Sequence, residues 1–270
     1  MEPSYWKRYD QVFKRYSLKK IYEEILSFAE KLGEPFAKKG NRGPKLKVKA
    51  NEYAAYMVFE MITYNCPFRD MELGSELFLD EHIDHSTFGK NFQKIPYEYL
   101  LGLLHSTSYF LEQLLGKVQL LIADSTGMHT RIYQNCIMEG KETLRKKRLK
   151  VHALIASHKD QHLTYVRTGL ATDLRTSDAA GAASMLLAQS ASDCLFLADR
   201  GYDYETAYLA CKEKNIIANI KPQDRPSGRK SKQRKKTLPL YNLDLYKMGR
   251  GVVETIFGGL RNKGLLSTRF

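Results

Sequence analysis

The chain has 270 residues and carries 43 Lys plus Arg against 30 Asp plus Glu, which gives a formal net charge of +13. A hydrophobic fraction of 43% with 11% aromatic residues excludes a disordered chain and indicates one or two folded domains. The basic balance favours a polyanionic partner such as nucleic acid, with ribosomal and membrane-surface roles as the other readings. No apolar run approaches the roughly 20 residues of a membrane span, and the four cysteines form no Cys-x-x-Cys pair. We therefore expect a cytoplasmic protein with reduced thiols and no contact with a membrane.

The first part of the chain, residues 1–115, shows helical periodicity without strand alternation. Apolar residues recur at three- and four-residue intervals in Leu18–Leu32 and in Glu52–Tyr64. Further helices are predicted at Met71–Leu79, from an N-cap at Ser86 to Phe92, and at Tyr97–Leu115. Between the first two helices, Lys38–Lys49 holds six Lys or Arg with two glycines and a proline, which predicts a flexible basic loop. This region is the expected site of DNA binding and assembly.

From residue 116 onward the pattern changes to short β runs. Five strands are predicted, at Val118–Ala123, Val151–Ala156, Thr164–Leu170, Leu195–Ala198 and Ile216–Ile220. The first three follow one another without an intervening helix, as in an antiparallel meander. Helices predicted at Ala179–Gln189, Tyr204–Lys214 and Gly251–Lys263 surround the last two strands and indicate parallel crossovers. The expected fold is an α/β domain over residues 116–270, with a mixed five-stranded sheet and flanking helices, preceded by the helical region.

Three carboxylates stand out in this second part. Asp124 and Asp199 each close an apolar run, and Glu254 lies in a segment with helical periodicity. An acid at the end of a buried strand reaches the rim of the sheet, and a buried carboxylate without a partner is costly. In a chain this basic, three converging acids indicate a divalent-metal site that faces a polyanion. Taken singly, each acid also has a simpler interpretation: a turn former for the two aspartates, and an i,i+4 partner of Arg250 for Glu254.

In their order and spacing these residues resemble the DDE transposases of prokaryotic insertion sequences. The likeness rests on Ala123–Gly127 (ADSTG), on Leu197–Asp203 (LADRGYD), and on Arg250, Glu254 and Arg261, which match the Tyr-Arg-Glu-Lys signature of that family. The chain departs from the signature in three ways. Lys247 stands where the Tyr is expected, with Tyr246 one place earlier; Arg261 replaces the Lys; and Phe270 follows the helix closely.

The resemblance implies an RNase H-like catalytic domain and a DNA transposase of an insertion sequence. Such an enzyme cuts element ends by Mg²⁺-dependent phosphodiester hydrolysis and joins the freed 3′-hydroxyl to target DNA. It implies two Mg²⁺ (or Mn²⁺) ions, with Asp124 bridging both and Asp199 and Glu254 each completing one. It also implies double-stranded DNA partners (inverted-repeat ends and target), a homo-oligomer on DNA and a nucleoid location. The alternatives are a truncated, inactive DNA-binding remnant and an RNase H-like nuclease without strand transfer.

Two strongly basic segments border the acids. Lys141–Lys150, predicted as a loop or short helix, has six Lys or Arg in ten residues, and Arg225–Lys236 has seven in twelve. Such runs are commonly solvated surface, but beside the acids they also suit phosphate contacts. The candidate DNA-binding residues are Lys146, Lys147, Arg229, Lys230 and Lys235 in these segments, and Arg200, Tyr246, Lys247, Arg250 and Arg261 beside the acids.

Overall fold

The computed structural model describes residues 17–37, 45–138, 141–158, 163–224 and 231–262. The chain divides into two compact units, Met1–Leu103 and Leu104–Phe270. The division falls inside helix α6 (Tyr97–Leu115), whose last residue is where the sequence predicts the helical region to end. No helix of the described residues is long and apolar enough to cross a membrane.

The N-terminal unit is helical, as predicted. It consists of α2 (Leu18–Leu32), α3 (Ala50–Thr63), α4 (Phe68–Leu79), α5 (His85–Phe92) and the first residues of α6. Its core is rich in aromatic side chains, and Tyr53, Tyr56, Phe59 and Phe88 are all fully buried. The N-cap predicted at Ser86 is wrong, because the carboxylate of Asp84 accepts the Ser86 N–H at 2.8 Å and so begins α5 two residues earlier.

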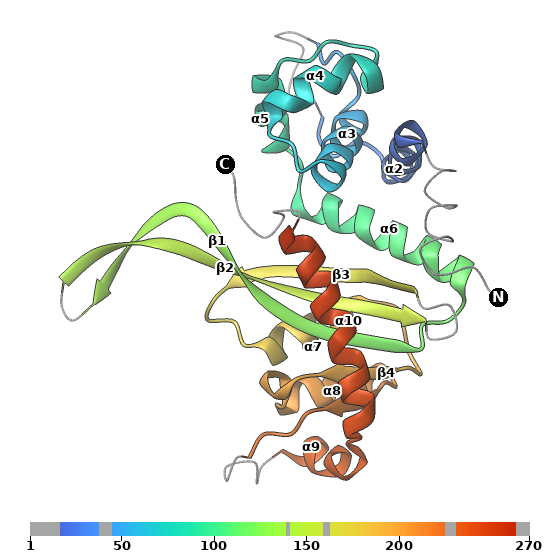
Figure 1. The fold of residues 1–270 in the computed structure, drawn as a ribbon, viewed down its shortest axis with the longest axis vertical. Coiled ribbons are helices and arrows are strands. Elements are labelled where there is room, and N and C mark those ends of the chain that lie inside the picture. The colour runs from blue at the N-terminus through green and yellow to red at the C-terminus, as the bar shows by residue number, and fades with distance from the viewer. Residues whose placement is uncertain (1–16, 38–44, 139–140, 159–162, 225–230, 263–270) are drawn as a thin grey trace. The chain divides into compact units, whose positions relative to one another are not determined.

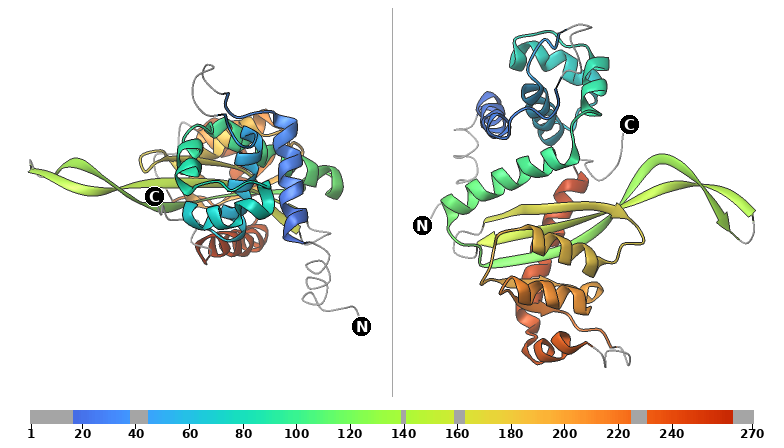
Figure 2. Two further views of the ribbon diagram at one scale, coloured as in Figure 1. Left: turned by 90° about the horizontal axis from the view of Figure 1, so that it is seen from above. Right: turned by 180° about the vertical axis from the view of Figure 1, so that it is seen from behind.

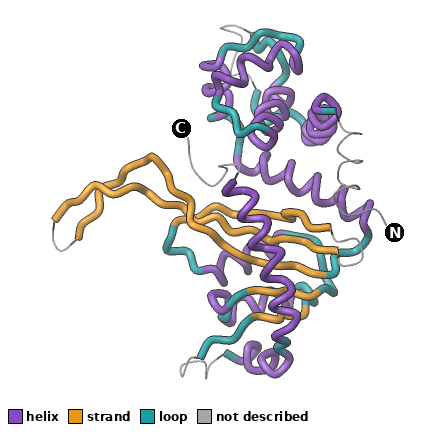
Figure 3. Tube along the Cα trace, viewed as in Figure 1, coloured by secondary structure: helices purple, strands orange, loops and turns teal. Residues whose placement is uncertain are grey.

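The C-terminal unit is built on a five-stranded sheet with strand order β3-β2-β1-β4-β5 (Figure 3). Its strands are β1 (Leu120–Met138), β2 (Lys141–His158), β3 (Leu163–Asp173), β4 (Leu195–Ala198) and β5 (Ile217–Ile220). The first three pair antiparallel, whereas β4 pairs parallel with both β1 and β5. The predicted arrangement of the mixed sheet, an antiparallel meander followed by parallel strands with helices between them, is confirmed.

Helices cover both faces of this sheet (Figures 1 and 2). On one face, Leu120, Ile122 and Leu197 pack against Val253 and Phe257 of α10 (Leu243–Asn262). On the other, the alternate residues of the same strands pack against α7 (Asp178–Ala188) and α8 (Glu205–Glu213). We call these the α10 face and the α7/α8 face.

Two predictions about β1 and β2 are wrong. Asp124 does not end its strand, because β1 continues to Met138, and Lys141–Lys150 forms part of β2 rather than a loop or helix. Pairing between the two strands runs from Leu120↔Ser157 to Met138↔Lys141, with one register shift between His129 and Tyr133, so backbone hydrogen bonds hold the basic segment extended despite its charges. Beyond Met128 and Leu149 this ladder has no further partner among the described strands. It projects from the sheet as a two-stranded ribbon (Figure 1).

The helix ends also differ in places. Helix α10 begins at Leu243 rather than Gly251, because the Asn242 side chain accepts the N–H groups of Asp244 and Leu245 at 3.0 and 3.1 Å. The basic segment before it contains α9 (Lys232–Thr237), followed by the 3₁₀ turn η4 (Leu238–Leu240). A second 3₁₀ turn, η2 (Arg200–Tyr202), directly follows Asp199.

Candidate active site

Asp124 and Asp199 lie where strands β1 and β4 part. The parallel pairing of these strands covers Leu120–Ile122, and β4 itself ends at Ala198. Both aspartates therefore follow the last paired residues of neighbouring parallel strands, an edge where side chains from separate strands meet. The two carboxylates line one pocket with Tyr246 and Arg250 of α10, over an apolar floor that includes Leu197 and Val253.

Asp124 is held in a poorly hydrated position. Burial raises the pKa of its carboxyl above the ordinary value, and the negative charge of Asp199 adds to this, while the Ser125 N–H and Arg250 oppose it. The Ser125 N–H donates to Asp124 Oδ1 at 2.8 Å. The charge of Asp178 adds a smaller contribution in the same direction as burial.

Asp199 is oriented by the turn that follows it. Its Oδ1 accepts the Gly201 N–H at 2.7 Å, which makes Asp199 the cap of η2. Its Oδ2 lies 4.0 Å from Nη1 of Arg250, so this second oxygen faces the pocket. The neighbouring Arg200 side chain is exposed.

Glu254 reaches this site through Arg250. The Arg250 Nε donates to Glu254 Oε1 at 2.8 Å, and both side chains are largely exposed. Glu254 does not line the pocket, and the three acids do not place their oxygens within 4.8 Å of one another. In the described part of the chain the group that does so is Glu72, Asp84 and His85 of the N-terminal unit, whose carboxylates accept backbone N–H groups at the start of α5.

The signature of the sequence did not align its Tyr position with a tyrosine, because Lys247 stands there and Tyr246 one place earlier. In the structure it is Tyr246 that lines the pocket. It stands four residues before Arg250 on α10, so the two side chains share a face, and the Lys221 ammonium lies 5.3 Å from the centre of its ring. Lys247 is exposed and does not line the pocket. A close approach of α10 to the sheet depends on Gly249, because a Cβ there would collide with the side chain of Leu197.

The remaining candidate cations are spread over the unit. Arg261 on α10 and Lys235 on α9 are exposed. Lys146 and Lys147 lie on β2, but their side chains are outside the described part of the structure, and Arg229 and Lys230 lie outside the described residues altogether.

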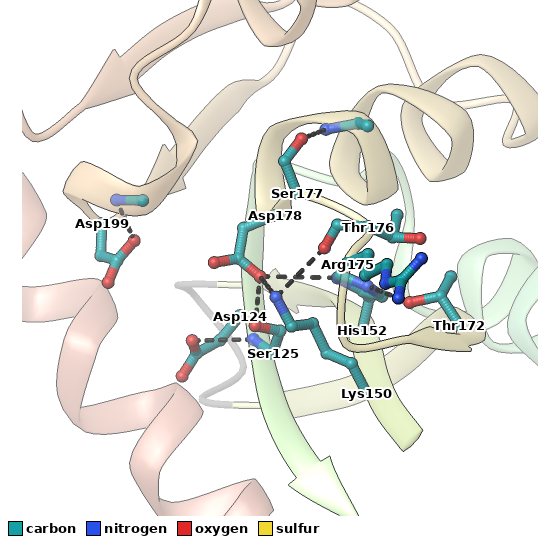
Figure 4. A network of polar contacts seen from close by, with 12 residues as sticks. Asp124, Ser125, Lys150, His152, Thr172, Arg175, Thr176, Ser177, Asp178 and Asp199 are labelled. Atoms are coloured by element: carbon teal, nitrogen blue, oxygen red, sulfur yellow. Dashed lines mark hydrogen bonds and ion pairs between the residues drawn. The ribbon is translucent and has the colours of Figure 1, made fainter. Parts of the chain in front are cut away.

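Two polar clusters were missed by sequence reasoning. Arg234, in the second basic segment, binds the buried carboxylate of Asp203 through two hydrogen bonds of 2.6 and 2.5 Å. Asp178, the first residue of α7, lies on the α7/α8 face of the sheet and contacts Ser125 of β1 (Figure 4). An acid directly after the capping residue Ser177 looks like an ordinary helix start, so no sequence signal marked it.

Comparisons with known proteins assign the sequence that carries this site to a family. Residues 116–270 match the family model described as the transposase DDE domain. A search of curated proteins found no match. Among solved structures, the Mos1 transposase paired-end complex with left transposon end is similar at 10% identity and a TM-score of 0.26, covering 82% of this chain and 74% of that chain, which is too distant to support an argument. Because the family model spans more than half of the sequence, the chain belongs to the transposase DDE domain family.

Proposed function

We propose that this protein is a DNA transposase that cuts phosphodiester bonds at the ends of an insertion sequence with divalent metal ions and joins the 3′-hydroxyl to target DNA. The observation that carries the proposal is the pair Asp124 and Asp199, set side by side beyond the last β1–β4 pairs with Arg250 in the same pocket. Family membership supports the DNA chemistry, and the acids supply the groups that this chemistry requires.

The residues present fit a divalent cation. Carboxylate oxygens are the ligands that Mg²⁺ and Mn²⁺ prefer, and a bound cation would offset the burial and the neighbouring charges of Asp199 and Asp178 that raise the pKa of Asp124. Asp124, Asp199 and Glu254 would hold two ions, with Glu254 giving up its hydrogen bond to Arg250. When bound, such ions lower the pKa of water and stabilise charge on a leaving oxygen.

The protein's own residues bind and orient the DNA. Arg250, once released from Glu254, stays beside Asp199 and presents a guanidinium suited to a phosphate. Exposed Arg200 and Lys247, next in sequence to the pocket residues Asp199 and Tyr246, extend this contact. We expect the other candidate cations, Arg261, Lys235, Lys146, Lys147, Arg229 and Lys230, to contact DNA as well. We expect the helical N-terminal unit to bind inverted-repeat ends and the protein to act as a homo-oligomer on paired ends.

A nicking assay on labelled element ends tests the proposal. With Mg²⁺, Asp199→Ala is expected to lower the cleavage rate by at least about 10³-fold, since several kcal/mol of charge stabilisation is lost. Its affinity for DNA should stay close to that of the unaltered protein. The matched control is Asp244→Ala, which removes an exposed acid from the first turn of α10 and should leave cleavage intact.

Three results would contradict the proposal in different ways. Cleavage by Asp199→Ala equal to that of the unaltered chain removes the assigned site. Binding of matched ends without any cutting by the unaltered chain identifies a DNA-binding remnant. Cutting without joining to a target duplex identifies a nuclease that lacks strand transfer.

A further inference from the structure

The side chain of Asp178 does not cap the helix to which it belongs. The N-terminus of α7 is capped by Ser177, whose hydroxyl accepts the Ala180 N–H at 3.2 Å. The adjacent Asp178 is not needed for that cap, and its carboxylate turns toward the sheet (Figure 4). It is about one-quarter exposed, so its charge is largely withdrawn from water.

The contacts of Asp178 converge on one oxygen. Its Oδ1 accepts the Ser125 hydroxyl at 2.5 Å and the Lys150 ammonium at 3.2 Å. An O–H···O⁻ bond of this length is charge-assisted and stronger than a neutral one. Lys150 also donates to the carbonyl of Thr176 at 3.1 Å, which ties β2 to the loop before α7.

Ser125 connects the carboxylate of Asp178 to the active site. Its hydroxyl is bound by Asp178 on the α7/α8 face, while its backbone N–H donates to Asp124 Oδ1, which faces α10. Alternate residues of a strand point to opposite faces, so the two bonds act on the backbone from both sides. At this point β1 no longer pairs with β4 and pairs only with β2. Asp124 lies opposite Ala153, and Ser125 lies opposite His152.

The helix that carries Asp178 is itself held in place. His152 is fully buried, and its Nε2 lies 2.9 Å from the Thr172 hydroxyl oxygen. A Cβ on Gly181 of α7 would come within 2.6 Å of Nδ1 of His152, so this glycine allows the first turn of α7 to rest on the imidazole. Asp178 therefore acts from a rigid support.

We propose that Asp178 is a positioning residue that acts through Ser125 to fix the carboxylate of Asp124 for metal binding. This inference rests on the proposed function, since it takes Asp124 as a metal ligand. Groups that orient a metal ligand set its affinity for the ion, commonly by 10- to 100-fold.

Direct titration of the metal-free protein with Mn²⁺ tests the inference without using catalysis. Asp178→Ala and Ser125→Ala should each weaken Mn²⁺ binding by about 10- to 100-fold. The double variant should be hardly weaker than either single one, because both remove the same link. Ser125→Thr keeps a hydroxyl and should restore binding, and Asp244→Ala is the control for loss of an acid in a helix first turn.

A second readout needs no metal. Amide hydrogen exchange at Ser125 should be faster in Asp178→Ala and in Ser125→Ala than in the Asp244→Ala control. If Asp124→Asn abolishes Mn²⁺ binding while Asp178→Ala and Ser125→Ala leave it unchanged, the positioning role is wrong and the proposed function stands. If Asp124→Asn binds Mn²⁺ as well as the unaltered protein, the metal site itself is wrong. Amide exchange at Ser125 then still shows whether the hydrogen bond from Ser125 to Asp178 holds this part of β1 in place.

Discussion

The two faces of the sheet in the C-terminal unit are built differently. On the α7/α8 face, a large apolar core surrounds Leu121 and Phe196, both fully buried, and even the charged pair Asp203–Arg234 is inside, with the Asp203 side chain 0% exposed. On the α10 face, a single helix covers a few apolar residues, and its ion pair Arg250–Glu254 lies at the surface, with Glu254 60% exposed.

This difference separates stability from chemistry. Under the proposed function, the groups that bind metal and DNA need access to solvent and freedom to change partners, which the α10 face provides. Groups that hold the strands in register need burial, which the α7/α8 face provides. Asp124 and Ser125, adjacent on β1, belong one to each face. We expect substitutions on the α7/α8 face to reduce mainly the free energy of unfolding, and those on the α10 face mainly activity.

Breaking the buried ion pair should have the largest effect on stability. Arg234→Met leaves the Asp203 carboxylate buried without its cation, at a cost of about 3–5 kcal/mol in the free energy of unfolding at neutral pH. Chemical denaturation measures this. A loss below about 1 kcal/mol would show that the α7/α8 face tolerates a lone charge.

The pH dependence of that loss follows from the pKa of Asp203. Burial alone would raise it, but hydrogen bonds from Arg234, the Gln223 N–H and Tyr208 outweigh burial and hold it below the ordinary value. In the unaltered protein this stabilisation is present above the unfolded pKa, near 3.8, and is lost as the pH falls through the folded pKa. In Arg234→Met the unpaired carboxyl binds a proton more readily, so the difference between the two proteins should shrink on acidification.

Truncating one phenylalanine on each face compares the two cores directly. Phe196→Ala on β4 is expected to cost about 3–5 kcal/mol, because its ring is fully buried among strand and helix side chains. Phe257→Ala on α10 should cost less, because its ring packs in a smaller apolar cluster that a single helix covers. If urea denaturation shows equal losses of unfolding free energy for the two variants, the two cores do not differ in the way described.

Two glycines provide a finer comparison, since each allows a helix to approach the sheet. In Gly181→Ala the new methyl meets the rigid, fully buried ring of His152, which should cost about 1–3 kcal/mol. In Gly249→Ala it meets the flexible side chain of Leu197, so the loss should be smaller. Thermal unfolding of both variants checks the order.

The smallest change in stability should accompany a large change in activity. Glu254→Gln removes an exposed i,i+4 ion pair, which contributes about 0.3–0.5 kcal/mol. Under the proposed function it should nevertheless lower Mg²⁺-dependent cleavage by about 10²-fold or more, since a ligand is lost. If Glu254→Gln lowers the free energy of unfolding and leaves the cleavage rate unchanged, the roles assigned to the two faces are reversed.

Sequence patterns predicted the helices well, because α2 and α6 place apolar residues at helical intervals along their whole length. They failed for the outer half of β1 and β2, since Lys141–Lys150 has charges rather than alternation and is held extended only by its neighbour. In the site, the aspartates were found because each follows an apolar run of the sequence. The Asp178–Ser125 contact joins residues 53 positions apart, and no local pattern announces it.

The ribbon formed by β1 and β2 has a mechanical consequence. Asp124 lies on the same strand as the ribbon's outer end at Met138, about 45 Å away along an extended backbone. Under the proposed function, a duplex that pulls on or twists the ribbon would load the peptide chain that carries Asp124. The Ser125 hydroxyl, which Asp178 binds, lies on this strand between Asp124 and the ribbon, so this hydrogen bond ties β1 to α7 directly beside Asp124.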